Sequence, residues 1–547
     1  QQMEQPGTIG MKAQLDLYNL LRPEVQPGEK LDYEPSPEEV TLTVRSDAAE
    51  SYVSINGKPG HWMTGDGVDL KVQYTLTPKK DELIPVEIQL RHNGGEALPK
   101  LVVSYHTNED ARERALPLRR FLLPWSSRDE EPPSTPVENR DLPQLTGGNW
   151  LRGEREFFGS VAGCSKCHTM RGVGARIGPD LSNLPQRDYE SVLRDVTQPS
   201  FAINPDFTSQ TVLLEEGRVL AGTVRADGDH LVIADQEGKE TVVHRDEVES
   251  LEHSPQSIMP EGIPQALGQE RLRDLMTFLL VAPPTMPQYG TMQPPPPRPM
   301  AEVNAVLAGS EPPAADAAPL HIVLVAGTKD HGPGEHDYPA WKKAWRELLE
   351  MAGNVRVTTA DDWPSEEDLK SADALVFYQK GDWPAERARD MDRFLTRGGG
   401  VTYIHYAVRG GDNAAEFAER IGLAWNDAWP QYRHGPLDIE FTPGSTHPIA
   451  RNFDRVHFYD ESYWNAVGDP RRLNVLATGI EQGKPQPLFW TREHLGGRIF
   501  VSIPGHYSWT FDDPLFRILL LRGIAWTAGE SVDRFNELAL PGARVGR

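Results

Sequence analysis

The chain has 547 residues, of which 38% are hydrophobic, so it can form several globular domains and is not disordered as a whole. Its formal net charge is −24, from 80 acidic and 56 basic residues. A surface with this acidic excess repels nucleic-acid phosphates and anionic lipids, which argues against nucleic acid as a partner. No apolar run reaches the ~20 residues of a membrane helix, so we expect no transmembrane segment.

The chain contains only two cysteines, Cys164 and Cys167. A fold held together by several disulfides is therefore excluded. A site with four thiolates around zinc or an iron–sulfur cluster is excluded as well.

Residues 1–125 contain short runs in which apolar and polar residues alternate, such as 41–45. The dipeptide Asn56-Gly57 is typical of a hairpin turn. These patterns predict a β-sandwich, and we find no catalytic cluster in it. The proline-containing residues 126–149 indicate a linker.

Residues 150–282 begin and end with helical patterns, and strand-like runs at about 208–252 lie between them. We expect a helical domain with a small inserted β-meander or barrel. The next segment, 283–320, contains four consecutive prolines at 294–297 and many alanines. This composition predicts a semi-stiff tether that buries no core.

From residue 321 onward, apolar strands alternate with amphipathic helices. This alternation predicts βαβ units around a parallel, doubly wound sheet. We therefore expect residues 321–547 to form an α/β domain.

Residues 164–168 read Cys-Ser-Lys-Cys-His, the attachment signature of c-type haem. The two thiols can bond the two vinyl groups at one edge of the porphyrin, and the adjacent imidazole can bind the iron from that face. We expect one covalent haem c on Cys164 and Cys167, with His168 as the proximal iron ligand. The alternative is a redox-active cysteine pair that happens to precede a histidine.

Residues 171–181 resemble the class I cytochrome c pattern, in which a proline carbonyl faces the proximal histidine, and Pro179 takes that place here. Such a bond would fix the tautomer and orientation of His168. Residues 257–262 resemble the methionine loop of the same family, which makes Met259 the expected axial ligand. The alternatives that remain open are Met170, Met276 and His253.

The segment 150–282 as a whole is similar to the haem-binding domain of multidomain cytochromes from Planctomycetes and Verrucomicrobia, in which a β-rich insertion separates the haem motif from its methionine. The resemblance implies transfer of single electrons to a redox partner protein. The chain shows no flavin, nicotinamide or phosphate-loop fingerprint, so we expect the two-electron oxidant on that partner, with a sugar dehydrogenase as the candidate. Because bacteria attach haem c outside the cytoplasmic membrane, we expect a periplasmic or secreted protein whose signal peptide has been removed.

Several segments after residue 321 resemble the trehalose-utilisation (ThuA-like) family, whose fold is related to class I glutamine amidotransferases. They are residues 325–338, 398–407, 447–449, 459–463, 505–509 and 522–526. The resemblance implies a flavodoxin-like fold and a carbohydrate ligand or substrate. The expected architecture is thus multidomain, with an N-terminal β-sandwich, a helical cytochrome c domain with a β insertion and a C-terminal α/β domain.

Polar residues of these segments should meet at one edge of the sheet, since the C-terminal ends of parallel strands converge there. His405 takes the place of the amidotransferase nucleophile, and no cysteine is free for thiol chemistry. Glu461 and His506 come from two further segments, and His331 could join them from the loop after the first strand, where His336 also lies. Such a cluster could bind a divalent metal or perform acid/base catalysis on a sugar, although each histidine could also be structural. Tryptophans that could stack on a sugar are Trp383, Trp425, Trp429, Trp464 and Trp509.

Three functions are consistent with these patterns. The first is an exported cytochrome fused to a domain that binds or processes a carbohydrate. The second is an electron-transfer protein whose other domains dock partners. The third is a metal-dependent sugar hydrolase or isomerase in which the haem is a relay.

Overall fold

The computed structural model divides the chain into two compact units, residues 1–135 with 204–208 and residues 136–203 with 209–547, which we describe separately. The part of the expected linker from 126 to 140 lies outside the described residues. No helix in the described part of the chain is both long and apolar enough to cross a membrane. The described residues are 6–18, 20, 37–58, 60–64, 70–80, 82–93, 99–108, 111, 113–117, 120–122, 141–204, 207–227, 229–289, 293–314, 317–427 and 431–546.

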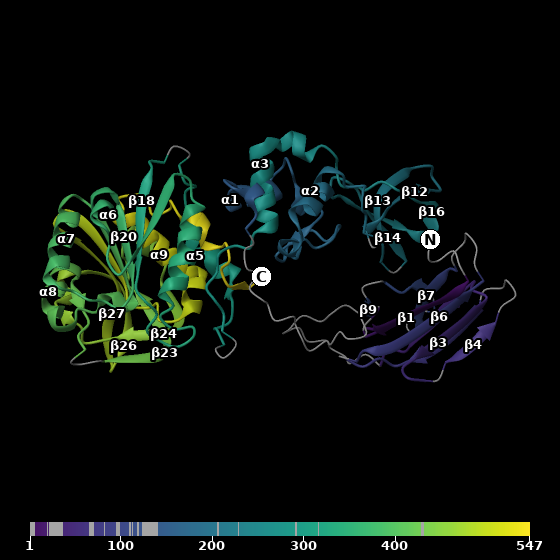
Figure 1. The fold of residues 1–547 in the computed structure, drawn as a ribbon, viewed down its shortest axis with the longest axis horizontal. Coiled ribbons are helices and arrows are strands. Elements are labelled where there is room, and N and C mark those ends of the chain that lie inside the picture. Colours follow the sequence, from purple (N-terminus) through teal and green to yellow (C-terminus); the bar gives the residue numbers. More distant parts are fainter. Residues whose placement is uncertain are drawn as a thin grey trace. The chain divides into compact units, whose positions relative to one another are not determined.

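The first unit consists of two antiparallel sheets, with strand orders β4-β3-β6-β1-β9 and β5-β2-β7-β8. Alternate residues of β3 are buried, and side chains from both sheets, such as Leu42 and Ile88, form one core. Asn56 and Gly57 have positive φ angles directly after β3, as the hairpin dipeptide predicts. The unit is a β-sandwich (Figure 1). The strands are β1 (Gly7–Leu15), β2 (Val40–Ser46), β3 (Glu50–Ile55), β4 (His61–Thr64), β5 (Leu70–Leu76), β6 (Ile84–His92), β7 (Leu101–Thr107), β8 (Arg114–Ala115) and β9 (Phe121–Leu122).

The described residues between 141 and 282 contain the helices α1 (Trp150–Phe158), α2 (Tyr189–Thr197) and α3 (Ile263–Leu280). Helices α1 and α3 cross closely at Gly153, where an added Cβ would lie 2.0 Å from the carbonyl oxygen of Asp274. The haem-attachment-like motif, residues 164–168, which we call the haem-like motif, follows α1 in a short turn. It leads into the strands β10 (Thr169–Met170) and β11 (Val173–Gly174).

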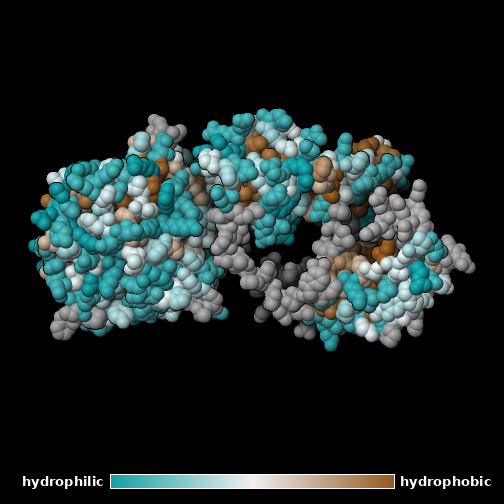
Figure 2. Space-filling model, viewed as in Figure 1, coloured by the Kyte–Doolittle hydropathy of each residue, from teal (hydrophilic) through white to brown (hydrophobic). Residues whose placement is uncertain are grey.

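A five-stranded antiparallel sheet separates α2 from α3, in the order β15-β14-β13-β12-β16. It has its own small apolar core, and Val219, Val242 and Leu251 are exposed on it. Figure 2 shows apolar surface over these strands. The sheet stands where the sequence predicts an inserted meander. Its strands are β12 (Ser209–Leu214), β13 (Val219–Asp227), β14 (His230–Ala234), β15 (Glu240–His244) and β16 (Val248–His253).

The segment 283–320 is not a free tether, which corrects the expectation from its composition. Its helix α4 (Met300–Leu307) buries Val303 and Val306 in the main core of the unit. The strand β17 (Arg298–Pro299) pairs in parallel with β29 (Val545–Gly546). The apolar residues of α4 have helical spacing but lie between proline runs, so the composition of the segment hides a helix with a buried face.

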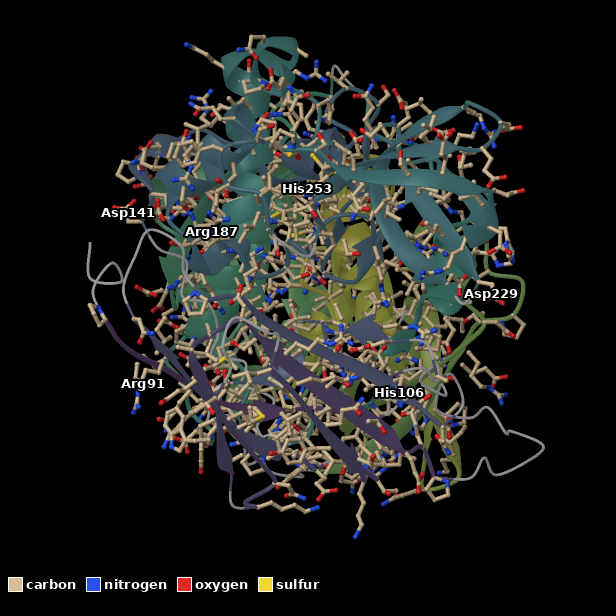
Figure 3. The ribbon with its side chains drawn as sticks, turned by 90° about the vertical axis from the view of Figure 1, so that its right-hand side faces the viewer. Arg91, His106, Asp141, Arg187, Asp229 and His253 are labelled. Carbon is tan, nitrogen blue, oxygen red and sulfur yellow. The ribbon has the colours of Figure 1, made fainter. Side chains whose placement is uncertain are left out.

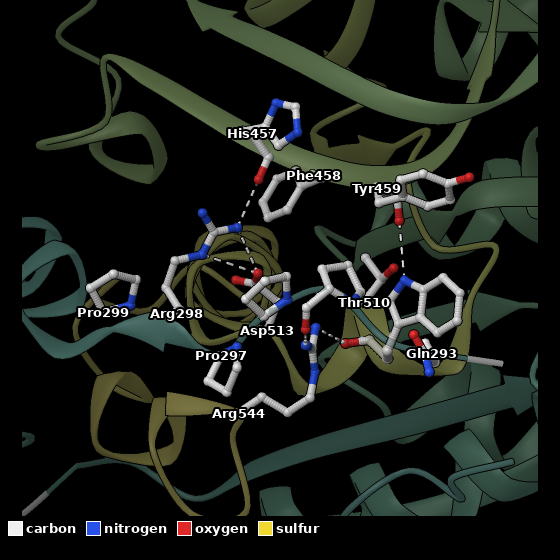
Figure 4. A pocket seen from close by; sticks show the side chains of 13 residues that line it. Gln293, Pro297, Arg298, Pro299, His457, Phe458, Tyr459, Thr510, Asp513 and Arg544 are labelled. Carbon is white, nitrogen blue, oxygen red and sulfur yellow. Dashed lines mark hydrogen bonds and ion pairs between the residues drawn. The ribbon is translucent and has the colours of Figure 1, made fainter. Parts of the chain in front are cut away.

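Side-chain contacts hold this segment on the C-terminal domain. Arg298 donates hydrogen bonds to a carboxylate oxygen of Asp513 at 2.7 Å and to the carbonyl of His457 at 2.8 Å. A cavity of about 410 Å³ lies here between the proline run and Tyr459 and Trp509 (Figure 4). The indole N–H of Trp509 donates to the carbonyl of Tyr459 at 3.1 Å. The described residues of the segment 283–320, which we name the strap, thus lie along the C-terminal domain.

The C-terminal domain is built on a nine-stranded sheet, in the order β19-β18-β20-β21-β28-β27-β26-β23-β24. The half from β19 to β28 is parallel, as predicted, and the half from β28 to β24 is antiparallel. In Figure 1 the sheet runs between α5 and α9 on one side and α7 and α8 on the other. The strands are β18 (Leu320–Ala326), β19 (Val355–Asp361), β20 (Ala374–Tyr378), β21 (Gly400–Ile404), β23 (Tyr432–Phe441), β24 (Arg455–Tyr463), β26 (Asn474–Glu481), β27 (Lys484–His494) and β28 (Gly497–Ser502), and the helices are α5 (Tyr338–Glu350), α6 (Glu366–Ser371), α7 (Ala385–Thr396), α8 (Ala414–Ile421) and α9 (Pro514–Thr527).

Candidate functional site

Two histidines of the candidate site have left-handed backbone conformations. His405 directly follows β21 with a φ of +54°, and His336 lies in the loop after β18 with a φ of +43°. Both side chains are buried. Such conformations cost free energy in residues other than glycine and are kept where the surroundings fix them. The fold therefore holds both imidazoles in set directions.

Glu461 and His506 reach the same place from different elements. Glu461 lies on β24, which belongs to the antiparallel half of the sheet, and His506 follows β28. The carboxylate of Asp460, beside Glu461, accepts hydrogen bonds from the backbone N–H groups of Gly505 and His506, each at 3.0 Å. Asp460 thus docks the His506 loop onto β24.

The four side chains form a compact cluster. His336, His405, Glu461 and His506 each offer one ligand atom, and these atoms all lie within 4.8 Å of one another. The Nε2 atoms of His336 and His405 are 2.9 Å apart. Glu461 Oε2 lies 3.1 Å from His405 Nε2 and 2.8 Å from His506 Nδ1. We name these four residues the histidine–glutamate cluster.

The outer hydrogen bonds of two members fix which nitrogen faces inward. His405 Nδ1 lies 2.7 Å from the carbonyl oxygen of Ile503, which can only accept, so Nδ1 carries the proton. His336 Nδ1 lies 2.9 Å from a carboxylate oxygen of Asp330. Both Nε2 atoms therefore present lone pairs to the centre of the cluster. This pattern is typical of metal-ligating histidines, whose second nitrogen donates to a carbonyl or carboxylate.

The pKa shifts of His336 and Glu461 favour the protonation states in which these residues can bind a metal ion. Burial lowers the pKa of His336 to about 3, so its imidazole is neutral. Burial alone would raise the pKa of Glu461, but hydrogen bonds from His405 and His506 hold it well below its usual range. Burial alone would lower the pKa of His405, and the Glu461 carboxylate outweighs it and raises that pKa.

The donor set selects among cations. Three imidazoles and one carboxylate suit zinc and other first-row divalent metals, whereas magnesium and calcium prefer oxygen ligands. The histidine–glutamate cluster therefore fits a divalent transition metal in its donor types and in its outer hydrogen bonds.

Comparison with known proteins agrees with the architecture of this domain. A family model described as trehalose utilisation, ThuA, matches residues 322–527. Residues 322–527 form a ThuA-like domain. Comparison with curated proteins gives no match.

The solved structures that are similar to part of this chain include the following three. A putative ThuA-like protein from Parabacteroides merdae is 20% identical, with 39% of this chain and 91% of that chain covered and a TM-score of 0.30. A putative ThuA-like protein from Bacteroides uniformis is 17% identical, with 40% and 98% covered and a TM-score of 0.33. A β-galactosidase from Bacillus circulans sp. alkalophilus is 13% identical, with 38% and 31% covered and a TM-score of 0.27.

Two further histidines of the ThuA-like domain, His331 and His434, lie beside the histidine–glutamate cluster. His331, which the sequence proposed for the site, is not one of the four convergent residues. It is partly exposed, and its Nδ1 lies 2.9 Å from Asp330, whose carboxylate also binds His336. His434 on β23 stands opposite Glu461 in the strand register, with its Nε2 3.8 Å from Glu461 Oε1.

Sequence reasoning missed three residues of this site. Tyr463 places its hydroxyl 3.1 Å from His405 Nε2, and Asp330 and His434 make the contacts given above. The alternation along β23 places His434 on the exposed face with Asp438 and Glu440, so neither His434 nor Asp330 has a signal in the sequence.

The haem-like motif has the hydrogen bond that the sequence predicts. His168 Nδ1 lies 2.8 Å from the carbonyl oxygen of Pro179, so this hydrogen bond is made by Nδ1 and not by Nε2. A Cβ on Gly178 would lie 2.7 Å from the His168 ring, so the glycine lets the chain pass close to it. Cys164 and Cys167 are not joined by a disulfide, and burial raises the pKa of the Cys164 thiol to about 12.

The candidates for the axial ligand differ in burial. Met259 is partly buried against the main core, and its backbone N–H donates to the Ser257 hydroxyl at 3.1 Å. Met170 and Met276 are buried in that core, where they pack as ordinary apolar residues. His253 is exposed at the end of β16 (Figure 3).

Proposed function

We propose that the ThuA-like domain processes a carbohydrate with the help of a divalent metal. The observation that carries the proposal is the convergence of three imidazoles and one carboxylate within 4.8 Å. The carbohydrate class is supported by the family description, trehalose utilisation.

Each residue has a defined part in this proposal. His336, His405, Glu461 and His506 would hold the metal, which supplies a Lewis acid that polarises a sugar hydroxyl or carbonyl oxygen. His331 is partly exposed and bound to the Asp330 carboxylate, so it can exchange a proton with a substrate bound beside the cluster. His434 Nδ1, 3.1 Å from the Tyr507 hydroxyl, can orient a second polar group. These parts suit hydrolysis or isomerisation of a sugar.

Metal binding by the full chain tests the proposal. We expect the protein, stripped with a chelator, to take up one equivalent of zinc, manganese or cobalt in elemental analysis and calorimetry. Glu461→Gln should weaken the affinity at least 100-fold, because it removes the anionic ligand. The matched control is Glu440→Gln, an exposed residue of β23 that should bind metal as the wild type does. Absence of uptake, or unchanged affinity in Glu461→Gln, would contradict a metal centre.

A second function is supported by the haem-like motif. Residues 150–282 are proposed to carry one covalent haem c, bonded to Cys164 and Cys167, with His168 and Met259 as iron ligands. The supporting observations are the His168–Pro179 hydrogen bond and the exposed apolar side chains of Phe158 and Val161, which directly precede the motif and could pack on a porphyrin.

The haem would supply one-electron transfer to a redox partner protein, with a sugar dehydrogenase as the candidate. The protein would then be periplasmic or secreted. We expect haem to stay with the chain on acid–acetone extraction, and loss of haem there would contradict covalent attachment. The ferric protein should show the weak red band of an iron–thioether bond, which Met259→Ala should abolish and Met276→Leu should keep.

A further inference from the structure

The loop that carries His336 is paired with the loop that carries His506. The backbone N–H of His336 donates to the carbonyl of His506 at 2.9 Å. The neighbouring residues Glu335 and Tyr507 form an isolated antiparallel β-bridge. This pairing brings the side chain of Glu335, which is not one of the four cluster residues, close to the His506 ring.

His506 turns a different nitrogen toward the histidine–glutamate cluster than His336 and His405 do. Its Nδ1 lies 2.8 Å from Glu461 Oε2 and 3.3 Å from His405 Nε2. The other two imidazoles face each other through their Nε2 atoms. A neutral imidazole has one N–H and one lone pair. When Nδ1 of His506 gives its lone pair to a metal, the proton of this ring is therefore on Nε2.

The Nε2 atom of His506 is buried and makes no hydrogen bond within the described part of the chain. The Glu335 carboxylate oxygen Oε1 lies 3.5 Å from it, slightly beyond the usual length of such a bond. The Glu335 side chain is 30% exposed, so a small rotation can close this gap. The other two imidazoles of the cluster already have outer acceptors, the Asp330 carboxylate and the Ile503 carbonyl.

We propose that Glu335 is a positioning residue of the metal centre, which accepts a hydrogen bond from His506 Nε2 and thereby makes Nδ1 the metal-binding nitrogen. A carboxylate that accepts the outer N–H of a ligand histidine fixes its tautomer and ring orientation and makes the imidazole a stronger ligand. The metal itself rests on the proposed function, whereas the choice of nitrogen and of acceptor is a separate claim.

Proton NMR of the full chain loaded with cobalt(II) tests the proposal. Cobalt moves the proton signals of its ligands far outside the ordinary range, and imidazole N–H signals are recognised there because they vanish in deuterium oxide. We expect three such signals. One of them should show a nuclear Overhauser effect to the Cδ2 proton of its own ring, since only an imidazole bound through Nδ1 has its N–H next to Cδ2. In Glu335→Ala, water reaches Nε2 and this signal should be lost.

The possible failures can be told apart in the same spectra. Three exchangeable signals without this Overhauser effect would overturn the proposal and leave the metal centre in place. Persistence of all three signals in Glu335→Ala would overturn it as well. Absence of every shifted signal would overturn the metal centre, and the role of Glu335 with it.

Cobalt affinity, measured by calorimetry, gives a second reading. Glu335→Ala should weaken it about 10- to 100-fold, the usual effect of removing the outer partner of a ligand histidine. Glu335→Gln keeps an acceptor oxygen and should restore the lost signal and an affinity within about fivefold of the wild type. The matched control is Glu440→Ala, at an exposed position of β23, which should bind as the wild type does. Wild-type affinity in Glu335→Ala would overturn the proposal. Should this variant fail to fold, the wild-type Overhauser effect decides.

Discussion

Backbone conformation at single residues prepares the histidine–glutamate cluster. His336 and His405 both have positive φ angles, which a histidine adopts at a cost of about 1–2 kcal/mol. The hydrogen bonds of their Nδ1 atoms to Asp330 and to the Ile503 carbonyl hold the rings in place. The lone pairs therefore meet before a metal arrives, so less ordering is needed when it binds.

Gly505 is the residue on which this arrangement depends most directly. Its φ is +139°, and an added Cβ would lie 2.9 Å from Ile404 Cγ2 and 3.2 Å from His405 Cβ. We predict that Gly505→Ala moves His405 and weakens metal affinity at least tenfold, measured by calorimetry.

The matched control for Gly505→Ala is Gly483→Ala. Gly483 also has a positive φ of +73°, but an added Cβ would meet nothing within 4 Å. This variant should lose some thermal stability and keep the metal affinity. Equal affinities in the two variants would show that strain at Gly505 does not reach the cluster.

At this scale the sequence predicted three of the four cluster residues and misplaced one. His405, Glu461 and His506 follow or lie in strands that resemble a known family, so their convergence could be expected. The sequence prediction named His331 from the loop after β18, whereas the structure brings His336 of the same loop to the cluster. The φ of +43° at His336 brings that imidazole to the cluster. No residue type in the loop predicts this backbone conformation.

At the scale of elements, the start of α9 anchors the strap. The carboxylate of Asp512, in the turn before the helix, accepts the backbone N–H of Met286 at 3.1 Å. The Arg517 guanidinium donates to the same carboxylate at 3.0 Å. All three residues are buried, so a chain segment 226 positions away is tied to the helix by one carboxylate.

The pH dependence of stability should report on Asp512. Burial outweighs Arg517 and raises the pKa of Asp512 to about 6, from an ordinary value of 3.8 in the unfolded chain. The folded state therefore takes up a proton between these values, and the stability that this proton contributes is present below pH 4 and lost as the pH rises through 6.

Asp512→Asn cannot take up this proton. We predict that the wild type loses on the order of 2 kcal/mol of unfolding free energy relative to this variant between pH 4 and 6.5, measured by urea denaturation. Asp412→Asn, at an exposed position of the same domain, should follow the wild type at every pH. A constant difference between wild type and Asp512→Asn would show that Asp512 is ionised throughout.

The sequence predicts the parallel half of the sheet but not the pairing in its antiparallel half. The apolar strands β18, β20 and β21 are buried throughout, which is the pattern of a parallel sheet covered on both faces. Strand β23 alternates between buried and exposed residues, as expected for an antiparallel strand with one face in water. Strand β23 pairs with the next long strand, β24, and the hydrogen bonds of Asp460 to Gly505 and His506, 45 and 46 positions further along the chain, place Glu461 in the site.

At the scale of the whole molecule, the strap is part of the ThuA-like domain's structure. Arg522 and Asn452 donate hydrogen bonds to the carbonyl of Val306 at 3.1 and 3.2 Å, so the end of α4 is capped by side chains of that domain. Composition alone could not show this, because proline-rich segments are stiff whether they are free or docked. Docking is decided by the few apolar residues between the prolines.

Limited proteolysis should therefore leave α4 intact. We predict that elastase does not cut within residues 300–307 of the native protein, followed by mass spectrometry of the fragments. Val303→Asp should open this stretch to cleavage, because a carboxylate in the apolar core costs about 3 kcal/mol and releases the helix. Asn304→Asp places the same charge on the exposed face of α4 and should stay resistant. Rapid cleavage of the wild type within α4, at the rate seen for Val303→Asp, would show that the segment is a tether after all.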